Sequence, residues 1–100
     1  MFINTIEFPP IKDGKESEFL EWFKWSNSIY KNFDGFISRR LLKLTKGTKS
    51  YVSLVEHKSE KTFMNMHTSK ERQEAFMKLK PLLDGSLAAK FYDVVIDQTQ

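Results

Sequence analysis

The feature that most constrains the fold is the order in which two hydrophobic periods follow one another along the chain. The opening stretch "FINTIEF" alternates, with Phe2, Asn4, Ile6 and Phe8 on one face, which is typical of a β-strand with one buried side. The two prolines that follow end this strand because proline cannot donate to the sheet ladder. The alternation therefore predicts a first strand over residues 2–8.

A helical period begins near residue 15, where large apolar side chains recur at steps of three and four residues. Lysines and glutamates take the opposite side, which predicts an amphipathic helix of about four to five turns. Gly35 in "NFDG" closes this helix, since glycine readily adopts the left-handed backbone of helix ends. The apolar stripe is formed by Phe19, Trp22, Phe23, Ser26, Tyr30 and Phe33.

The remaining chain predicts two strands, a helix and a last strand. The strands cover residues 36–44 and 50–57, joined by a hairpin turn in "TKGTK", and Ser59 is expected to cap the second helix. A break near "HTSK" is compatible with its pattern, and the last strand covers residues 88–97. This order predicts a single α+β domain over residues 1–100, a ferredoxin-like β-α-β-β-α-β antiparallel sheet with both helices on one face.

The aromatic content is higher than a single small core is expected to bury. A chain of 100 residues buries only about two-thirds of its extended surface on folding. It carries nine Phe, three Tyr and two Trp, more than one small core easily absorbs. A second subunit or a sizeable ligand pocket is therefore expected to cover the rest.

Several classes are disfavoured by composition. The chain has no cysteine, so disulfides and thiolate metal sites are excluded. Its first residues lack the pattern of a signal peptide, and no apolar run approaches the roughly 18 residues that span a bilayer. The expected location is the cytoplasm, without a membrane partner.

Nucleic-acid binding is also disfavoured. The net charge is +3, but thirteen acidic residues are interleaved with sixteen basic ones, which is typical of a solvated surface. The one locally basic segment, residues 38–49, fits a lysine-rich strand edge better than a phosphate site. RNA-binding domains of the same element order need a glycine and stacking aromatics in the third strand, whereas "SYVSLVEH" has no glycine and one aromatic.

Motifs along most of the chain resemble the antibiotic biosynthesis monooxygenase (ABM) family. They are the helix start at Gly14 and Lys15, the "DGF" turn from Asp34, the aromatic Phe63 after the third strand, and Ser69 with the "LKPLL" ending. Each motif alone has low specificity, but the motifs together, in this order, are fairly specific. The resemblance covers about nine-tenths of the chain. The resemblance implies a dimeric α+β barrel, hence a homodimer, with a cavity between sheet and helices.

The same resemblance implies a catalytic asparagine, which falls on Asn4 of the first strand. Alternation also turns Asn4 into apolar surroundings, where an unpaired amide costs about 1–3 kcal/mol. Two interpretations remain open: Asn4 donates to a bound oxygen or enolate, or backbone groups satisfy it. The other predicted pocket residues are Ile6, Trp22, Phe23, Phe63, Met66, His67 and Phe76.

The chain departs from the family pattern at three positions. His57 stands where many members have tryptophan, Met66 where they have histidine or tryptophan, and Phe76 where the haem-degrading branch has its proximal histidine. Because phenylalanine has no lone pair for iron, haem degradation of that type is not expected, and no metal or cofactor is predicted.

Both histidines are candidate ligands. His57 and His67 lie ten residues apart, not at the spacing that places two ligands on one helical face. His57 is expected to hydrogen-bond near the helix start, and His67 is either a helix-end residue or an acid–base group. Met64 and Met66 are expected to pack in a core or pocket.

Three further aromatic residues are candidates for contacts outside the core. Trp25 lies off the centre of the apolar stripe, where a pocket mouth or a dimer contact is one alternative to an ordinary surface position. Tyr30 and Tyr92 could each supply an O–H to a ligand.

The leading hypothesis is a cofactor-independent monooxygenase that oxygenates a small aromatic or enol substrate in an apolar cavity. The alternative is a non-catalytic, ligand-binding or structural dimer of the same barrel. Haem binding through a new ligand such as His67 is a third, weaker hypothesis.

Overall fold

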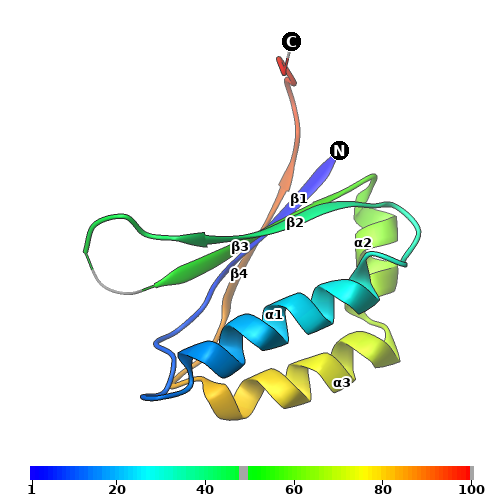
Figure 1. The fold of residues 1–100 in the computed structure, drawn as a ribbon. Helices are drawn as coiled ribbons and strands as arrows, with labels where there is room; N and C mark the ends of the chain where they lie inside the picture. The colour runs from blue at the N-terminus through cyan, green and yellow to red at the C-terminus, as the bar shows by residue number, and fades with distance from the viewer. Residues whose placement is uncertain (48–49, 100) are drawn as a thin grey trace.

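The computed structural model describes residues 1–47 and 50–99, and its centre is one antiparallel four-stranded sheet (Figure 1). The strands lie in the order β2-β3-β1-β4, so the two terminal strands of the sequence are neighbours. Each neighbouring pair is antiparallel. The strands are β1 (Phe2–Glu7), β2 (Phe36–Lys43), β3 (Tyr51–His57) and β4 (Ala88–Asp93).

The helices lie on one face of this sheet, with α1 and α3 side by side (Figure 1). They are α1 (Glu16–Tyr30), α2 (Glu60–His67), α3 (Lys70–Leu79) and a short 3-10 turn, η1 (Lys80–Leu82). The predicted α+β, ferredoxin-like fold is therefore confirmed. None of these helices is long and apolar enough to cross a membrane.

Local signals in the sequence account for most element boundaries. Ser59 caps α2 in a capping box. Its hydroxyl accepts from the Thr62 N–H at 3.1 Å, and the Thr62 hydroxyl oxygen accepts from the Ser59 backbone N–H. Gly35 has a φ of 84°, the left-handed backbone predicted there. The predicted turn in "TKGTK" includes residues 48 and 49, which lie outside the described residues.

Two boundaries differ from the sequence-based expectation. The last strand ends at Asp93 rather than at residue 97, because its partner β1 begins at Phe2, which pairs with Asp93. One further hydrogen bond follows, from the Val94 N–H to the Met1 carbonyl at 2.9 Å. The first helix, α1, ends at Tyr30 rather than at Gly35, which lies in the turn before β2. The second predicted helix is divided into α2 and α3 between His67 and Lys70, at the break expected near "HTSK".

The core lies between the sheet and the helices in two clusters. The first contains Phe2, Val55, Phe63 and Met66 among its buried members, and the second contains Phe8, Phe19, Tyr51 and Leu79 among others. Alternation on β1 contributes to both clusters, because Phe2 and Phe8 point toward the helices. The predicted facing of the first strand is therefore correct.

No described helix covers the opposite face of the sheet (Figure 1). Strand register places Ile3, Leu54, Val52, Leu42 and Tyr92 on this face, and Leu42 and Tyr92 are 45% and 47% exposed. We call these five residues the open sheet face.

Candidate functional site

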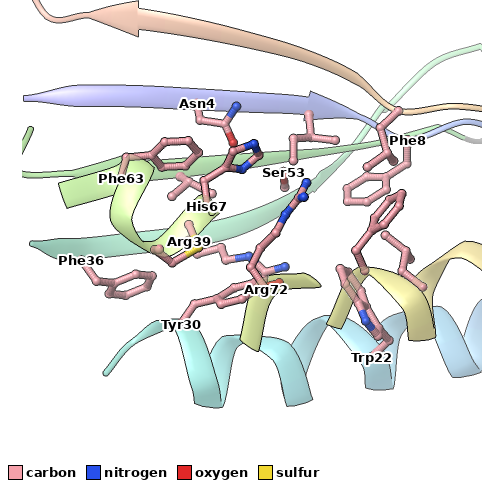
Figure 2. Close-up of a pocket in the computed structure, with 16 residues that line it drawn as sticks. Asn4, Phe8, Trp22, Tyr30, Phe36, Arg39, Ser53, Phe63, His67 and Arg72 are labelled. Atoms are coloured by element: carbon pink, nitrogen blue, oxygen red, sulfur yellow. The ribbon is translucent and has the colours of Figure 1, made fainter. Parts of the chain in front are cut away.

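A cavity lies between the sheet and the helices, and its lining includes residues of both core clusters (Figure 2). The space open to the centres of water molecules is about 50 Å³. Most of the lining is aromatic or aliphatic: Ile6, Phe8, Trp22, Tyr30, Phe36, Val55, Phe63, Met66, Phe76, Leu79 and Leu87. The polar lining residues are Asn4, Arg39, Ser53, His67 and Arg72.

The break between α2 and α3 positions one side of this cavity. Ser69 caps α3 by accepting from the Arg72 N–H at 3.1 Å, and its own hydroxyl donates to the Met66 carbonyl at 2.6 Å. The chain can therefore change direction without leaving buried backbone groups unpaired. As a result, Met66 and His67 from α2 and Arg72 from α3 face the same space.

Asn4 is almost fully buried at 2% exposure and lines the cavity from β1. Its amide nitrogen donates to the Lys90 carbonyl at 3.1 Å and to the Thr5 carbonyl at 3.3 Å. Since both N–H groups have backbone acceptors, the amide oxygen is the atom left to face the cavity, as Figure 2 shows. In this geometry Asn4 offers a ligand an acceptor, whereas the predicted oxyanion role requires a donor.

Arg39 enters the cavity from β2, beneath the sheet and above α1. Its guanidinium carbon lies 3.8 Å from the Phe23 ring centroid and 4.8 Å from that of Tyr30. One guanidinium nitrogen donates to the Phe23 carbonyl at 3.0 Å. Burial lowers the pKa of Arg39 to about 10, so the side chain is still charged at neutral pH.

Arg72 extends from α3 toward Ser53, and Tyr30 lines the lower side of the cavity from α1 (Figure 2). The Arg72 guanidinium carbon lies 5.3 Å from the Phe76 ring centroid. Burial raises the pKa of Tyr30, although the positive charges of Arg39 and Arg72 oppose that rise. The Tyr30 phenol is consequently protonated at neutral pH.

His67 is half-buried and stacks on Phe63, with ring centroids 5.3 Å apart and planes at 20°. Burial lowers the pKa of His67, and the nearby positive charge of Arg72 lowers it further. The imidazole is therefore neutral at physiological pH and can accept a proton. His67 is the last residue of α2, as the helix-end interpretation expected, and it also lines the cavity.

Three residues considered from the sequence lie away from the cavity lining. Phe23 is buried beneath Arg39, and Trp25 is 40% exposed with the Lys78 ammonium 5.0 Å from its ring centroid. Tyr92 belongs to the open sheet face. Phe23 thus lies behind the lining, in contact with Arg39 and Trp22.

His57 is fully buried and does not line the cavity. Its Nδ1 lies 3.0 Å from the Thr62 hydroxyl, as expected for a strand-end histidine held near the helix start. Burial lowers its pKa, and the partial opposition of Asp34 does not reverse this. This histidine supports the junction between β3 and α2.

The possible metal ligands of the site are few. Phe76 lines the cavity where the family resemblance would place a proximal haem ligand, and it offers no donor atom. Within residues 1–47 and 50–99 there is no group of three or more His, Asp or Glu side chains that could hold a metal ion.

The two arginines were missed from the sequence, although one of them had a signal. Arg39 alternates with Leu41 along the second strand and so shares its inward face, where a charged residue is exceptional. No sequence signal marks Arg72, because the direction of its side chain depends on the break between α2 and α3. The inward position of Ser53 on β3 could be predicted from the same alternation that turns Val55 inward.

Comparison with known proteins identifies the fold. No protein-family model matches the chain, and no curated protein is similar to it in sequence. Solved structures match over almost the whole chain. A cofactor-independent oxygenase from Streptomyces nogalater, SnoaB, has 13% identity and a TM-score of 0.82, covering 99% of this chain and 98% of that one.

Two other structures support the same conclusion. A protein from Caulobacter crescentus that bears the name of an antibiotic biosynthesis monooxygenase has 18% identity and a TM-score of 0.82, with 95% of this chain and 91% of that one covered. A conserved protein from Methanosarcina mazei has 21% identity and a TM-score of 0.80, with coverages of 92% and 91%. The chain therefore has an ABM-like fold, and the resemblance seen in the sequence is confirmed at the level of the fold.

Proposed function

We propose that this chain is a cofactor-independent oxygenase that acts on a small aromatic or enol substrate in the cavity between sheet and helices. The observation that carries this proposal is the cavity lining, in which aromatic rings surround a neutral imidazole, an amide oxygen and two guanidinium groups. The ABM-like fold, which the chain shares with a cofactor-independent oxygenase, gives independent support.

The proposed reaction uses dioxygen as its only co-substrate. The substrate loses a proton, and the resulting carbanion forms a carbon–oxygen bond with dioxygen, giving a peroxide. The peroxide takes up a proton and then loses water, which leaves a carbonyl group on the substrate. A methylene carbon is thus oxidised to a carbonyl, with one oxygen atom in the product and the other in water.

His67 is the proposed base in this reaction. Its neutral imidazole lines the cavity and can take the substrate proton, then return it to the peroxide. Negative charge develops on the substrate oxygen as the proton leaves, and Arg39 and Arg72 are the nearby groups that stabilise it. The apolar rings exclude water from the reactive intermediates.

Asn4 has a different proposed role from the one expected of an oxyanion donor. Its N–H groups donate to backbone carbonyls, so its oxygen would accept the substrate O–H and orient the ring. The original donor role requires the amide to release the Lys90 carbonyl and rotate. Asn4→Ala is expected to lower turnover in either case.

The proposed assembly is a homodimer in which two sheets pack through the open sheet face. Ile3, Leu54, Val52, Leu42 and Tyr92 would be withdrawn from water in such a dimer. The cavity lies on the helix side of each sheet, so each subunit would retain its own site. The cytoplasmic location stays a prediction.

Oxygen uptake tests the proposed activity. A dihydroxynaphthalene and enolised phenylpyruvate would be assayed with an oxygen electrode, after subtraction of spontaneous oxidation. Loss of a general base typically costs about 10²–10⁴-fold in rate, so His67→Gln should be slower by at least about 10²-fold. Asn65→Ala on the exposed side of α2 is the matched control and should keep the wild-type rate.

A non-catalytic ligand-binding dimer is the second candidate, favoured by the backbone hydrogen bonds that occupy both N–H groups of Asn4. A native mass spectrum would then show a dimer with a bound small molecule, while neither substrate supports uptake above the protein-free rate. That combination would remove the oxygenase proposal.

A further inference from the structure

The cavity contains two positively charged side chains and no negatively charged one. Arg39 and Arg72 line it, whereas none of the lining residues is an aspartate or glutamate. Within residues 1–47 and 50–99, neither guanidinium forms an ion pair; the neighbouring Arg40 does, with the Glu56 carboxylate at 2.8 Å. The excess of positive over negative charge in the cavity therefore lies on the helix side of the sheet.

Arg39 carries its charge where water solvates it poorly. It is surrounded by the rings of Phe23, Tyr30 and Trp22, and its one hydrogen bond to a described residue is to the Phe23 carbonyl. Ring faces and a single carbonyl compensate a guanidinium only in part, because it has five N–H donors. Charges in such surroundings are normally paired.

Arg72 leaves its donors available to the same space. Its side chain makes a ring contact with Phe76 but no hydrogen bond to any residue that the structure describes. Both guanidinium groups line the same cavity, and the positive charge of each lowers the pKa of the Tyr30 phenol. Each guanidinium is a forked donor whose geometry matches a carboxylate.

Tyr30 does not serve as an internal counter-ion. Burial raises the pKa of its phenol, so at neutral pH it is uncharged and can donate a hydrogen bond. The nearby His67 is neutral as well. The positive charge of the cavity thus has no partner among the described residues.

We propose that the ligand of this cavity is an organic anion, an aromatic or enol body that carries a carboxylate held by Arg39 and Arg72. The ring would lie against Phe63, Phe76 and Trp22, and the Tyr30 hydroxyl would donate to the carboxylate. This inference names the substrate class of the proposed oxygenase; it rests on the ligand cavity of that proposal and requires no turnover.

Binding of matched anionic and neutral probes tests this inference. Benzoate, phenylacetate and phenylpyruvate would be titrated by calorimetry in a low-salt buffer near neutral pH, beside benzamide and phenylacetamide. The same titrations would be made with Arg72→Gln, Arg39→Gln and Arg40→Gln. Arg40 is the matched control, since it is the next residue on β2, exposed, and on the opposite face of the sheet.

At least one carboxylate should bind the wild type more tightly than its amide. Removing one partner of a buried, hydrogen-bonded charge pair typically costs 2 kcal/mol or more, so Arg72→Gln should weaken that binding by at least about 30-fold. Arg40→Gln should leave it unchanged. Arg39→Gln should weaken binding similarly, and Arg39→Lys, which keeps the charge, should restore part of it.

Three results would overturn the inference. They are equal affinity for carboxylates and amides, no carboxylate binding at millimolar concentration, or an equal loss in Arg40→Gln and Arg72→Gln, which would indicate a general field effect. Because Arg39 packs against three rings, each variant's folding is checked by its thermal melt, and Arg72→Gln carries the test if Arg39→Gln is unfolded. Carboxylate binding without oxygen uptake would support this inference and reject only the oxygenase activity.

Discussion

Replacing Gly35 by alanine should destabilise the protein far more than replacing Gly14. Both glycines have left-handed backbones, with φ of 84° and 77°. A Cβ on Gly14 would meet nothing within 4 Å, whereas a Cβ on Gly35 would overlap Oγ1 and Cβ of Thr62 and lie 2.7 Å from its Cγ2. A rotation of the Thr62 side chain cannot clear this contact, because its Cβ is itself involved.

The size of the effect follows from what Thr62 does. The left-handed backbone alone costs about 1–2 kcal/mol for a residue other than glycine, which is the whole expected effect of Gly14→Ala. Displacing Thr62 also breaks the capping box with Ser59, at about 1 kcal/mol. It further deprives the buried His57 Nδ1 of its partner, at about 1–3 kcal/mol. Gly35→Ala should therefore cost about 3–6 kcal/mol in total.

Denaturant titration of the wild type and the two variants measures these differences directly. A free energy of unfolding of about 5–15 kcal/mol is usual for a domain of this size, so Gly35→Ala should remove a large share of it. The reasoning is refuted if the two variants lose equal stability, because the contact with Thr62 would then carry no cost. A loss of about 1–2 kcal/mol in Gly14→Ala verifies the control.

Three further predictions concern pH, assembly and the core. Burial lowers the pKa of His57 and, with Arg72, that of His67, so the unfolded chain binds protons more tightly than the folded one. Denaturant titrations should show constant stability well above pH 6.5, the ordinary imidazole pKa. As the pH falls below that value toward the folded-state pKa values, stability should fall by at most about 1.4 kcal/mol per pH unit and histidine; a flat profile would contradict this. Leu54→Lys should convert the proposed dimer to monomers in light scattering, while Met77→Lys on the exposed side of α3 should not; equal effects would argue against the open sheet face. Phe19→Ala should cost about 3–5 kcal/mol in unfolding free energy, since Phe19 is fully buried against Phe8; a loss below 1 kcal/mol would contradict that packing.

Periodicity explains why the fold could be read from the sequence. The alternation that turns Phe2, Asn4 and Phe8 inward and the helical stripe through Phe19 are short-range patterns, and each predicts its own element. Ser59 carries its cap signal in its residue type, and Gly35 has the left-handed backbone predicted for it, although α1 already ends at Tyr30. The fold follows because these elements have few ways to pack.

The site was less predictable because it depends on contacts between distant segments. Arg72 reaches the cavity only because Ser69 turns the chain between α2 and α3. Phe23 belongs to the predicted stripe, yet Arg39 from β2 covers it. The orientation of the Asn4 amide is set by the Lys90 carbonyl on β4, a contact that no local pattern announces.

In the proposed reaction, dioxygen attacks a substrate held beside His67 and Asn4. Its most direct test is a reaction with enolised phenylpyruvate under isotopically heavy dioxygen, with the organic product analysed by mass spectrometry. The account predicts that the wild type places heavy oxygen in the product faster than the buffer alone, and that His67→Gln does not. Equal label in the wild-type and protein-free reactions would contradict it.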